Sequence, residues 1–172
     1  MDVFEAIKKR RTIRRFDSAR EITDEQVERL LEAAQWASSA GNLQSRFFVV
    51  VRDKVAKKKL VEAAVRQMFI AEAPVVIVVC ADLERSASKY GSRGRELYAI
   101  QDATLAAQNM WLAATEMGLA FGWVGAFSEG EVSRILNLGE GLRPIAIMPL
   151  GYPAESPSPP PRRPVKEISK QV

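Results

Sequence analysis

ELYAIQDATLAAQNMWLAATEM, residues 96–117, is the longest stretch of helical periodicity in this 172-residue chain. Its apolar and small residues wrap most of the circumference of a helix, and Gly118 stands where helices commonly end. Its many alanines would let a neighbouring helix pack closely. We therefore expect a long helix buried on most sides, either at the centre of the fold or in a subunit interface.

Short apolar runs on both sides of this stretch predict the strands of a sheet. The run at 75–81, VVIVVCA, is apolar throughout, so both of its faces should be covered. Three further runs have the length and the β-branched or aromatic composition of strands. They lie at 47–51, 119–124 and 145–150.

Capping patterns place the remaining helices. Asp2 with Glu5, and Thr23 with Gln26, are spaced as capping boxes, the second opening a helix that runs to about Trp36. Further helices are expected at 53–67, with a solvated lysine face, and from Ser128 to Leu136, while 83–95 is expected to be a loop or a broken helix. The lysines assigned to solvent are Lys54, Lys57, Lys58 and Lys59.

Length and composition favour one globular domain. With 47% apolar residues the chain can bury a sizeable core. We expect a single domain over 1–152, with the Pro-rich basic tail 153–172 belonging to it. No apolar run has transmembrane length and the N-terminus lacks a signal-peptide core, so the expected location is the cytoplasm, with no membrane partner. The net charge of +4 favours anionic partners without requiring nucleic acid.

The absence of histidine excludes the common hydrolytic triads and removes the commonest metal ligand. The one cysteine, Cys80, lies in an apolar run and reads as an inert core thiol, so no metal site is expected. No dinucleotide or Walker A fingerprint occurs. The three tryptophans, Trp36, Trp111 and Trp123, are interpreted as core residues.

Three features remain unexplained by packing alone. Residues 8–16, KKRRTIRRF, contain six Lys or Arg in nine positions, which is enough to hold a phosphate by several charge-assisted bonds. Residues 37–45, ASSAGNLQS, form a small polar loop whose backbone could approach a ligand closely. The third feature is the pair Arg162–Arg163 in the tail. Taken singly, each is better explained by a solvated surface or a plain loop.

Taken in order, the motifs of the chain resemble the FMN-dependent nitroreductase superfamily over nearly the whole length. The departures are Ser38 and Ser45 in place of prolines and Arg46 in place of a tryptophan. The segments that carry the resemblance are RRTIRRF at 10–16, SSAGNLQSR at 38–46, APVVIVV at 73–79, QDATLAAQNMWLAATEMGL at 101–119, WVGAF at 123–127, GYP at 151–153 and PRRP at 161–164.

The resemblance implies an α+β fold with a mostly antiparallel central sheet flanked by helices. It also implies a homodimer that forms through the long helix, with two FMN sites at the interface. Arg10, Arg11 and Thr12 would contact the phosphate and ribityl chain, and Arg162 or Arg163 would close on the phosphate. Arg14 would approach the pyrimidine side of the flavin. The 38–42 loop of the partner subunit would line the ring, and Gly125 and Ala126 would offer backbone near the N5 edge. The cofactor-binding residues so implied are Arg10, Arg11, Thr12, Arg14, Ser38, Ser39, Ala40, Asn42, Gln67, Val124, Gly125, Ala126, Arg162 and Arg163.

The same resemblance implies an oxidoreductase in which the flavin, not a side chain, carries the chemistry. NADH or NADPH would give a hydride to flavin N5 and leave, and a nitroaromatic, quinone or similar acceptor would then be reduced in a ping-pong sequence. One alternative is a specialised flavoprotein of the superfamily, flavin-fragmenting or dehalogenating. Another is a basic nucleic-acid-binding module, which predicts steep salt dependence and no chromophore, and which the apolar central stretch disfavours.

Overall fold

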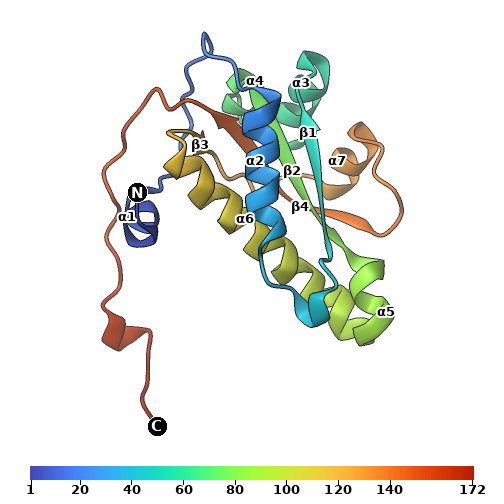
Figure 1. Cartoon of the computed structure of the whole chain (residues 1–172). Coiled ribbons are helices and arrows are strands. Elements are labelled where there is room, and N and C mark those ends of the chain that lie inside the picture. The colour runs from blue at the N-terminus through green and yellow to red at the C-terminus, as the bar shows by residue number, and fades with distance from the viewer.

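The computed structural model describes all 172 residues and has three layers, a sheet with helices on both faces (Figure 1). The four strands stand in the order β1-β2-β4-β3, and every neighbouring pair is antiparallel. The expected α+β class with an antiparallel sheet is therefore confirmed. The strands are β1 (Arg46–Val51), β2 (Val75–Asp82), β3 (Ala120–Phe121) and β4 (Leu142–Gly151).

Seven α-helices and three shorter turns connect the strands. The α-helices are α1 (Val3–Lys9), α2 (Asp24–Gln35), α3 (Lys54–Ala63), α4 (Phe69–Glu72), α5 (Leu83–Arg93), α6 (Ala99–Glu116) and α7 (Glu129–Ile135). The shorter elements are η1 (Ala40–Asn42), the π-type turn η2 (Gly94–Tyr98) and η3 (Val165–Glu167). No helix is long and apolar enough to cross a membrane.

Strand β2 divides the core into two parts. Its odd-numbered residues join the cluster that α2 and α6 bury on one face, and its even-numbered residues join the cluster under α3 and α7 on the other. Figure 1 shows α2 and α6 packed on the same face of the sheet. Because both faces are covered, β2 is apolar along its length, as its sequence indicated. Cys80 is fully buried there, and burial raises the pKa of its thiol to about 12.

The predicted capping signals are confirmed. The Glu5 backbone N–H donates to Asp2 Oδ1 at 2.8 Å, and the Gln26 N–H donates to Thr23 Oγ1 at 3.2 Å. Both capping boxes are complete, because each third residue also accepts from the backbone of the cap. Ser128 caps α7 in the same way, without the reciprocal bond.

Two predictions about α3 are wrong. The helix ends at Ala63 rather than near 67, because Val65 and Arg66 adopt left-handed backbone conformations with φ of 52° and 56°. Lys57 is not solvated: only 5% of its surface is exposed, and its Nζ donates to the carbonyl of Ala73 at 2.7 Å. A lysine stem can pack against apolar neighbours while its ammonium finds carbonyl partners, and here the ammonium finds them inside the fold.

Two strand predictions were wrong in length. The expected strand 119–124 shrinks to β3, because the next ladder position faces Pro149, which has no N–H to donate. Only Val124 pairs again, as an isolated bridge to Ile147. The expected strand 145–150 is instead extended in both directions to form β4, which pairs with β2 as far as Leu142 opposite Asp82.

The prediction for the long helix holds in part. Helical structure runs through η2 into α6, but α6 itself begins at Ala99. One face packs on the core, and the other is open, with Leu105 48% exposed. A single chain therefore leaves this helix half uncovered. The prediction that Trp36 is a core residue is wrong, because it follows the last turn of α2 and is 87% exposed.

Residues 83–95 form the broken helix that was expected as one of two options. Helix α5 kinks at Gly91, whose φ of 55° and ψ of −139° are outside the helical region. The tail after Gly151 is exposed and extended apart from η3, and it runs along the side of the molecule where α1 lies (Figure 1).

Candidate functional site

The residues implied as flavin ligands fall into three groups. The first is built on the segment that follows α1. Ile13 and Phe16 are buried and hold this segment against the sheet, where the Ile13 N–H donates to the Phe121 carbonyl at 3.1 Å. The residues between these two anchors, Arg14 and Arg15, are exposed to solvent. Arg14 is exposed, whereas Arg10, Arg11 and Thr12 are half-buried.

Three guanidinium groups come together at this point, and we call Arg10, Arg11 and Arg162 the arginine cluster. The pKa of Arg10 is lowered first by burial and then by the positive charges of Arg162 and Arg11. Residues from opposite ends of the chain thus share one positive region. No ion pair in the structure neutralises any of the three.

Arg11 has a second contact that sequence reasoning did not foresee. Its Nη1 donates to the carbonyls of Lys8 and Arg10 at 2.6 and 2.8 Å, where α1 ends. It therefore caps the helix, and its buried Nε has no partner. A pocket of about 200 Å³ opens beside Arg10 and Arg11, and its one carboxylate, Glu155, accepts the backbone N–H groups of Arg14 and Arg15.

The two tail arginines point to different partners. Arg163 bonds within the tail, with its Nη2 donating to the Glu167 carbonyl at 3.0 Å and its Nε 3.5 Å from the Glu167 carboxylate. Arg162 contacts only neighbouring proline carbonyls through Nη1 and lies close enough to Arg10 to affect its pKa. Of the pair, Arg162 is the one that the structure brings to the arginine cluster.

The second group is the loop at 38–42, which we call the polar loop. The Ala40 N–H donates to Asp102 Oδ1 at 3.0 Å, and the hydroxyl of Ser39 accepts the Gln44 N–H at 3.0 Å. A pocket of about 570 Å³ lies between this loop and the beginning of α6. Gly41 has φ of 56°, and a Cβ there would lie 2.5 Å from the Tyr90 hydroxyl. The left-handed backbone conformation and the Tyr90 hydroxyl both favour glycine here, and the predicted close approach of a ligand to this loop stays a prediction.

Asp102 is the residue of this region that sequence reasoning missed. It is only 2% exposed, and its Oδ2 has no hydrogen-bond partner. The signal was present in the sequence, because Asp102 is the one charged residue between Ala99 and Thr115. A buried carboxylate in an apolar helix is costly and so indicates a positioning or ligand role.

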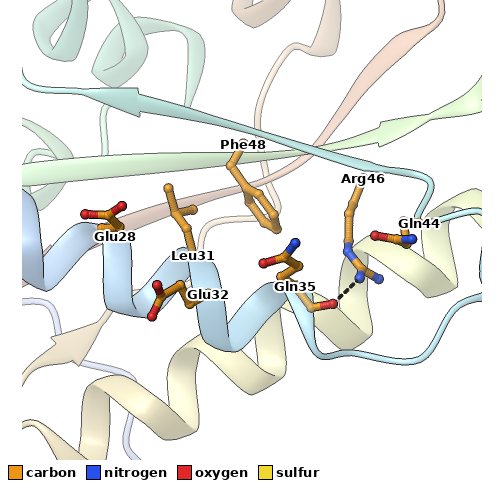
Figure 2. Close-up of a pocket in the computed structure, with 7 residues that line it drawn as sticks. All are labelled: Glu28, Leu31, Glu32, Gln35, Gln44, Arg46 and Phe48. Atoms are coloured by element: carbon orange, nitrogen blue, oxygen red, sulfur yellow. Dashed lines mark hydrogen bonds between the residues drawn. The ribbon is translucent and has the colours of Figure 1, made fainter.

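Arg46, which replaces the tryptophan of the resemblance pattern, follows the polar loop and contacts the end of α2. Its Nη2 donates to the Gln35 carbonyl at 2.7 Å and so caps the C-terminal end of α2 (Figure 2). The pKa of Arg46 is lowered, because the effect of burial outweighs the opposing effect of the negative charge of Asp102. The pocket beside it, about 360 Å³ between α2 and β1, contains none of the residues implied as flavin ligands.

The third group surrounds the turn at 124–126. Val124 is buried, whereas Gly125 and Ala126 are exposed. Gln67 reaches this turn from the end of α3, with Nε2 donating to the Ala64 carbonyl at 3.1 Å and lying 3.5 Å from that of Ala126. A Cβ at Gly125 would meet only Trp123 Nε1, at 3.6 Å, so the space in front of Gly125 is open.

An aromatic stack connects the first and third groups. The Arg10 guanidinium lies 4.6 Å from the centre of the Trp111 ring, and Trp111 stacks on Trp123 with centroids 5.9 Å apart and planes 1° from parallel. Cation–π contact and stacking both favour this arrangement. The stack thus links Arg10 of the arginine cluster, through Trp111, to Trp123, which directly precedes the turn at 124–126.

The polar loop lies at the other end of α6. The arginine cluster's pocket includes Thr115, whereas the polar loop is bonded to Asp102. At 1.5 Å per residue these two positions are about 20 Å apart along the helix axis. Within one chain the second group is therefore remote from the first.

The model of the nitroreductase family matches the chain in two overlapping segments, residues 7–72 and 61–152. A relative from Methanothermobacter thermautotrophicus, with the provisional name NADH dehydrogenase/NAD(P)H nitroreductase, is 36% identical over 164 residues, covering 91% of this chain and 80% of its own. An NADPH-flavin oxidoreductase of Vibrio harveyi is 32% identical over 174 residues, covering 97% and 72%.

Solved structures show the same fold. The NADPH:FMN oxidoreductase from Vibrio harveyi, complexed with NAD⁺, superposes with a TM-score of 0.89 at 31% identity, over 98% of this chain and 76% of that one. A nitroreductase family protein from Streptococcus pneumoniae superposes with a TM-score of 0.90 at 25% identity, over 99% and 100%.

Fold and sequence together thus define an oxidoreductase. More narrowly, the chain belongs to the nitroreductase family.

Proposed function

We propose that this protein is an FMN-dependent NAD(P)H oxidoreductase that reduces small-molecule acceptors. The observation that carries the proposal is the arginine cluster, in which Arg10, Arg11 and Arg162 gather without a neutralising carboxylate. The Vibrio harveyi relatives, named for NADPH, flavin and FMN, support the cofactor pair.

The residues present fit an FMN phosphate. A phosphate dianion needs several cationic donors, and guanidinium groups offer them in a planar fork. Arg10 is held in place by Trp111, so little side-chain entropy would be lost when it binds. The unpartnered Nε of Arg11 offers one more donor nearby.

The other groups fit the flavin ring. Gly125 faces open space, so its backbone could lie against a planar ligand with no side chain between. Bound FMN would accept a hydride from NADH or NADPH and pass electrons to an acceptor, for which we propose quinones and nitroaromatics in a ping-pong order. We assign Arg14 and Gln67 to the polar edge of the ring, as the resemblance implies, and Gln67 already lies beside the turn at Ala126. No histidine is needed for any step.

We further propose that the site is completed in a homodimer. The polar loop is about 20 Å from the arginine cluster within one chain, as the rise of α6 requires. A two-fold axis that packs the exposed face of α6 on its copy would bring opposite ends of the two helices together. The polar loop of the partner would then lie beside the arginine cluster. Helix α1 packs against α6, and the exposed apolar side chains of the two helices, Phe4, Ile7 and Leu105, supply surface for such an interface.

The first experiment is the absorbance spectrum and cofactor mass of the purified protein. We expect a yellow protein with FMN bound, and NADH or NADPH oxidation when a quinone or nitroaromatic is added. A colourless protein that does not take up added FMN would overturn the proposal. If that colourless protein also bound nucleic acid with a steep salt dependence, the basic nucleic-acid-binding reading would replace it.

A further inference from the structure

A second positive region lies away from the arginine cluster, in a cleft of about 660 Å³ that we call the α3 cleft. It is formed by the turn before α2, the start of α3 and the segment that leads into β2. Its lining contains five cationic side chains and two carboxylates. These charged residues are Arg20, Arg52, Lys54, Lys57, Lys58, Glu21 and Glu72.

Three of the five cations are held in fixed positions. The Arg20 guanidinium lies 3.3 Å from the centre of the Tyr152 ring. Arg52 donates to the carbonyl of Ile22 and to Asp24 Oδ1, both at 2.8 Å. Lys57 is buried, with its Nζ bonded to the carbonyl of Ala73. Cations fixed in advance bind an anion at a smaller entropic cost than free surface lysines do.

Apart from Arg52, which pairs with Asp24, the cations of the α3 cleft form no ion pair. Glu21 and Glu72 form no ion pair with any of its cations. Asp24 is bonded to Arg52, and Asp53 accepts the backbone N–H that caps α3. The pKa of Lys57 is lowered by burial and then by Lys54 and Arg52, and only Asp53 opposes this.

The α3 cleft has no lining residue in common with the pocket of the arginine cluster. Lys54 and Lys58 belong to α3, on the opposite face of the sheet from α6. A ligand of one region therefore leaves the other free.

We propose that the α3 cleft binds a small phosphate-bearing anion with at least two negative charges, at a site separate from that of the flavin. The cations surround a concavity rather than form a stripe along the surface, which suits a compact ligand better than a nucleic acid. The exposed cations Arg20, Lys54 and Lys58 can each contribute a charge-assisted hydrogen bond to phosphate oxygens. Lys57 and Arg52, which are bonded to other groups, add positive charge to the cleft.

The test is a calorimetric titration of the full chain with inorganic pyrophosphate, in chloride buffer of low ionic strength and with FMN at saturating concentration. Saturation with FMN occupies the arginine cluster, so binding that remains is expected at the α3 cleft with one pyrophosphate per chain. The double variant Lys54→Gln/Lys58→Gln loses two charge-assisted contacts and should bind about tenfold or more weakly.

Lys59→Gln is the matched control, because Lys59 lies on the same helix but outside the α3 cleft, and its affinity should be unchanged. Arg20→Gln tests the opposite wall and should also weaken binding. Lys54, Lys58 and Arg20 are exposed, so these variants should fold, which circular dichroism checks.

Absence of pyrophosphate binding at millimolar concentration would overturn this proposal and leave the flavin assignment intact. Binding that is abolished by Arg10→Ala or competed by FMN would overturn it as well, because the anion would then belong to the arginine cluster. Failure of the protein to take up FMN would bear on the proposed function alone, since the pyrophosphate titration can be repeated on the Arg10→Ala variant.

Discussion

The two ends of α6 each carry part of the proposed flavin site, and the two parts differ in charge and in shape. Near Thr115 the arginine cluster gathers positive charge around an open pocket. Near Asp102 the polar loop is fixed in shape by backbone bonds and carries no surplus of cations. The end near Thr115 therefore has positive charge but an open pocket. The end near Asp102 has an ordered loop beside its pocket but no cationic side chains.

This difference suggests that a complete flavin site combines the arginine cluster of one chain with the polar loop of another. The exposed strip of α6 between them is partly apolar, with Leu105 at 48% exposure, and a second copy related by a two-fold axis, with its α6 antiparallel to the first, would cover it. Assembly and cofactor binding would then be thermodynamically linked, because each site would form only in the assembled pair. The predictions that follow separate the two ends, beginning with the largest effect.

Leu105→Arg places a charge in the centre of the strip that joins the two ends. Burying an unpaired charge costs several kcal/mol, so we expect dimer dissociation to become easier by about 100-fold or more. FMN affinity should fall with it, while the fold of the chain stays intact. Light scattering and flavin titration at several protein concentrations measure both effects.

Val55→Arg is the control, since Val55 is also exposed but lies on α3. If Leu105→Arg remains a dimer with full FMN occupancy, the two ends do not meet through this face of α6.

Asp102→Ala removes the carboxylate that fixes the polar loop. The Ala40 N–H loses its acceptor and Arg46 loses a nearby opposite charge, so we expect about 2–4 kcal/mol lower stability. Denaturant unfolding measures this. Asp102→Asn keeps an acceptor for Ala40 and should cost less. Equal losses in the two variants would show that the negative charge, rather than the hydrogen bond, is what matters.

Arg10→Ala acts at the other end and should leave stability nearly unchanged. The loss of one charge-assisted contact to the phosphate should raise the FMN dissociation constant about 10- to 100-fold. Fluorescence titration with FMN measures this, and Arg15→Ala is the control because Arg15 is exposed outside the cluster. Full FMN occupancy together with a collapse in stability would make Arg10 a structural residue.

Trp111→Leu removes the aromatic face beneath Arg10 and should have the smallest effect. A cation–π contact is worth about 1 kcal/mol, so FMN affinity should fall several-fold. Trp111→Phe keeps an aromatic face and should retain more of the affinity. If Leu and Phe weaken FMN binding equally, the stack does not position Arg10.

Local signals in the sequence were interpreted correctly where short-range chemistry decides the structure. Asp2 and Thr23 form the capping boxes that their spacing predicts. The apolar run of β2 is covered on both faces, as its composition requires. Cys80 is an inert buried thiol, and Gly91 breaks α5.

Errors arose where a distant residue overrode the local pattern. Lys57 looked like part of a solvated lysine face, but the carbonyl of Ala73 draws its ammonium inward. Strand β3 stops early because Pro149 stands on the neighbouring strand.

The sequence by itself determined most of the helices and strands, the antiparallel α+β class through a family resemblance, and the list of residues that carry charge. It could not show that Arg10 and Arg162, about 150 positions apart, share one positive region, or that Asp102 fastens the polar loop. Helix caps and strand patterns depend on neighbours within a few residues. Where charges converge depends on how the chain folds back on itself, and only the tertiary structure decides that.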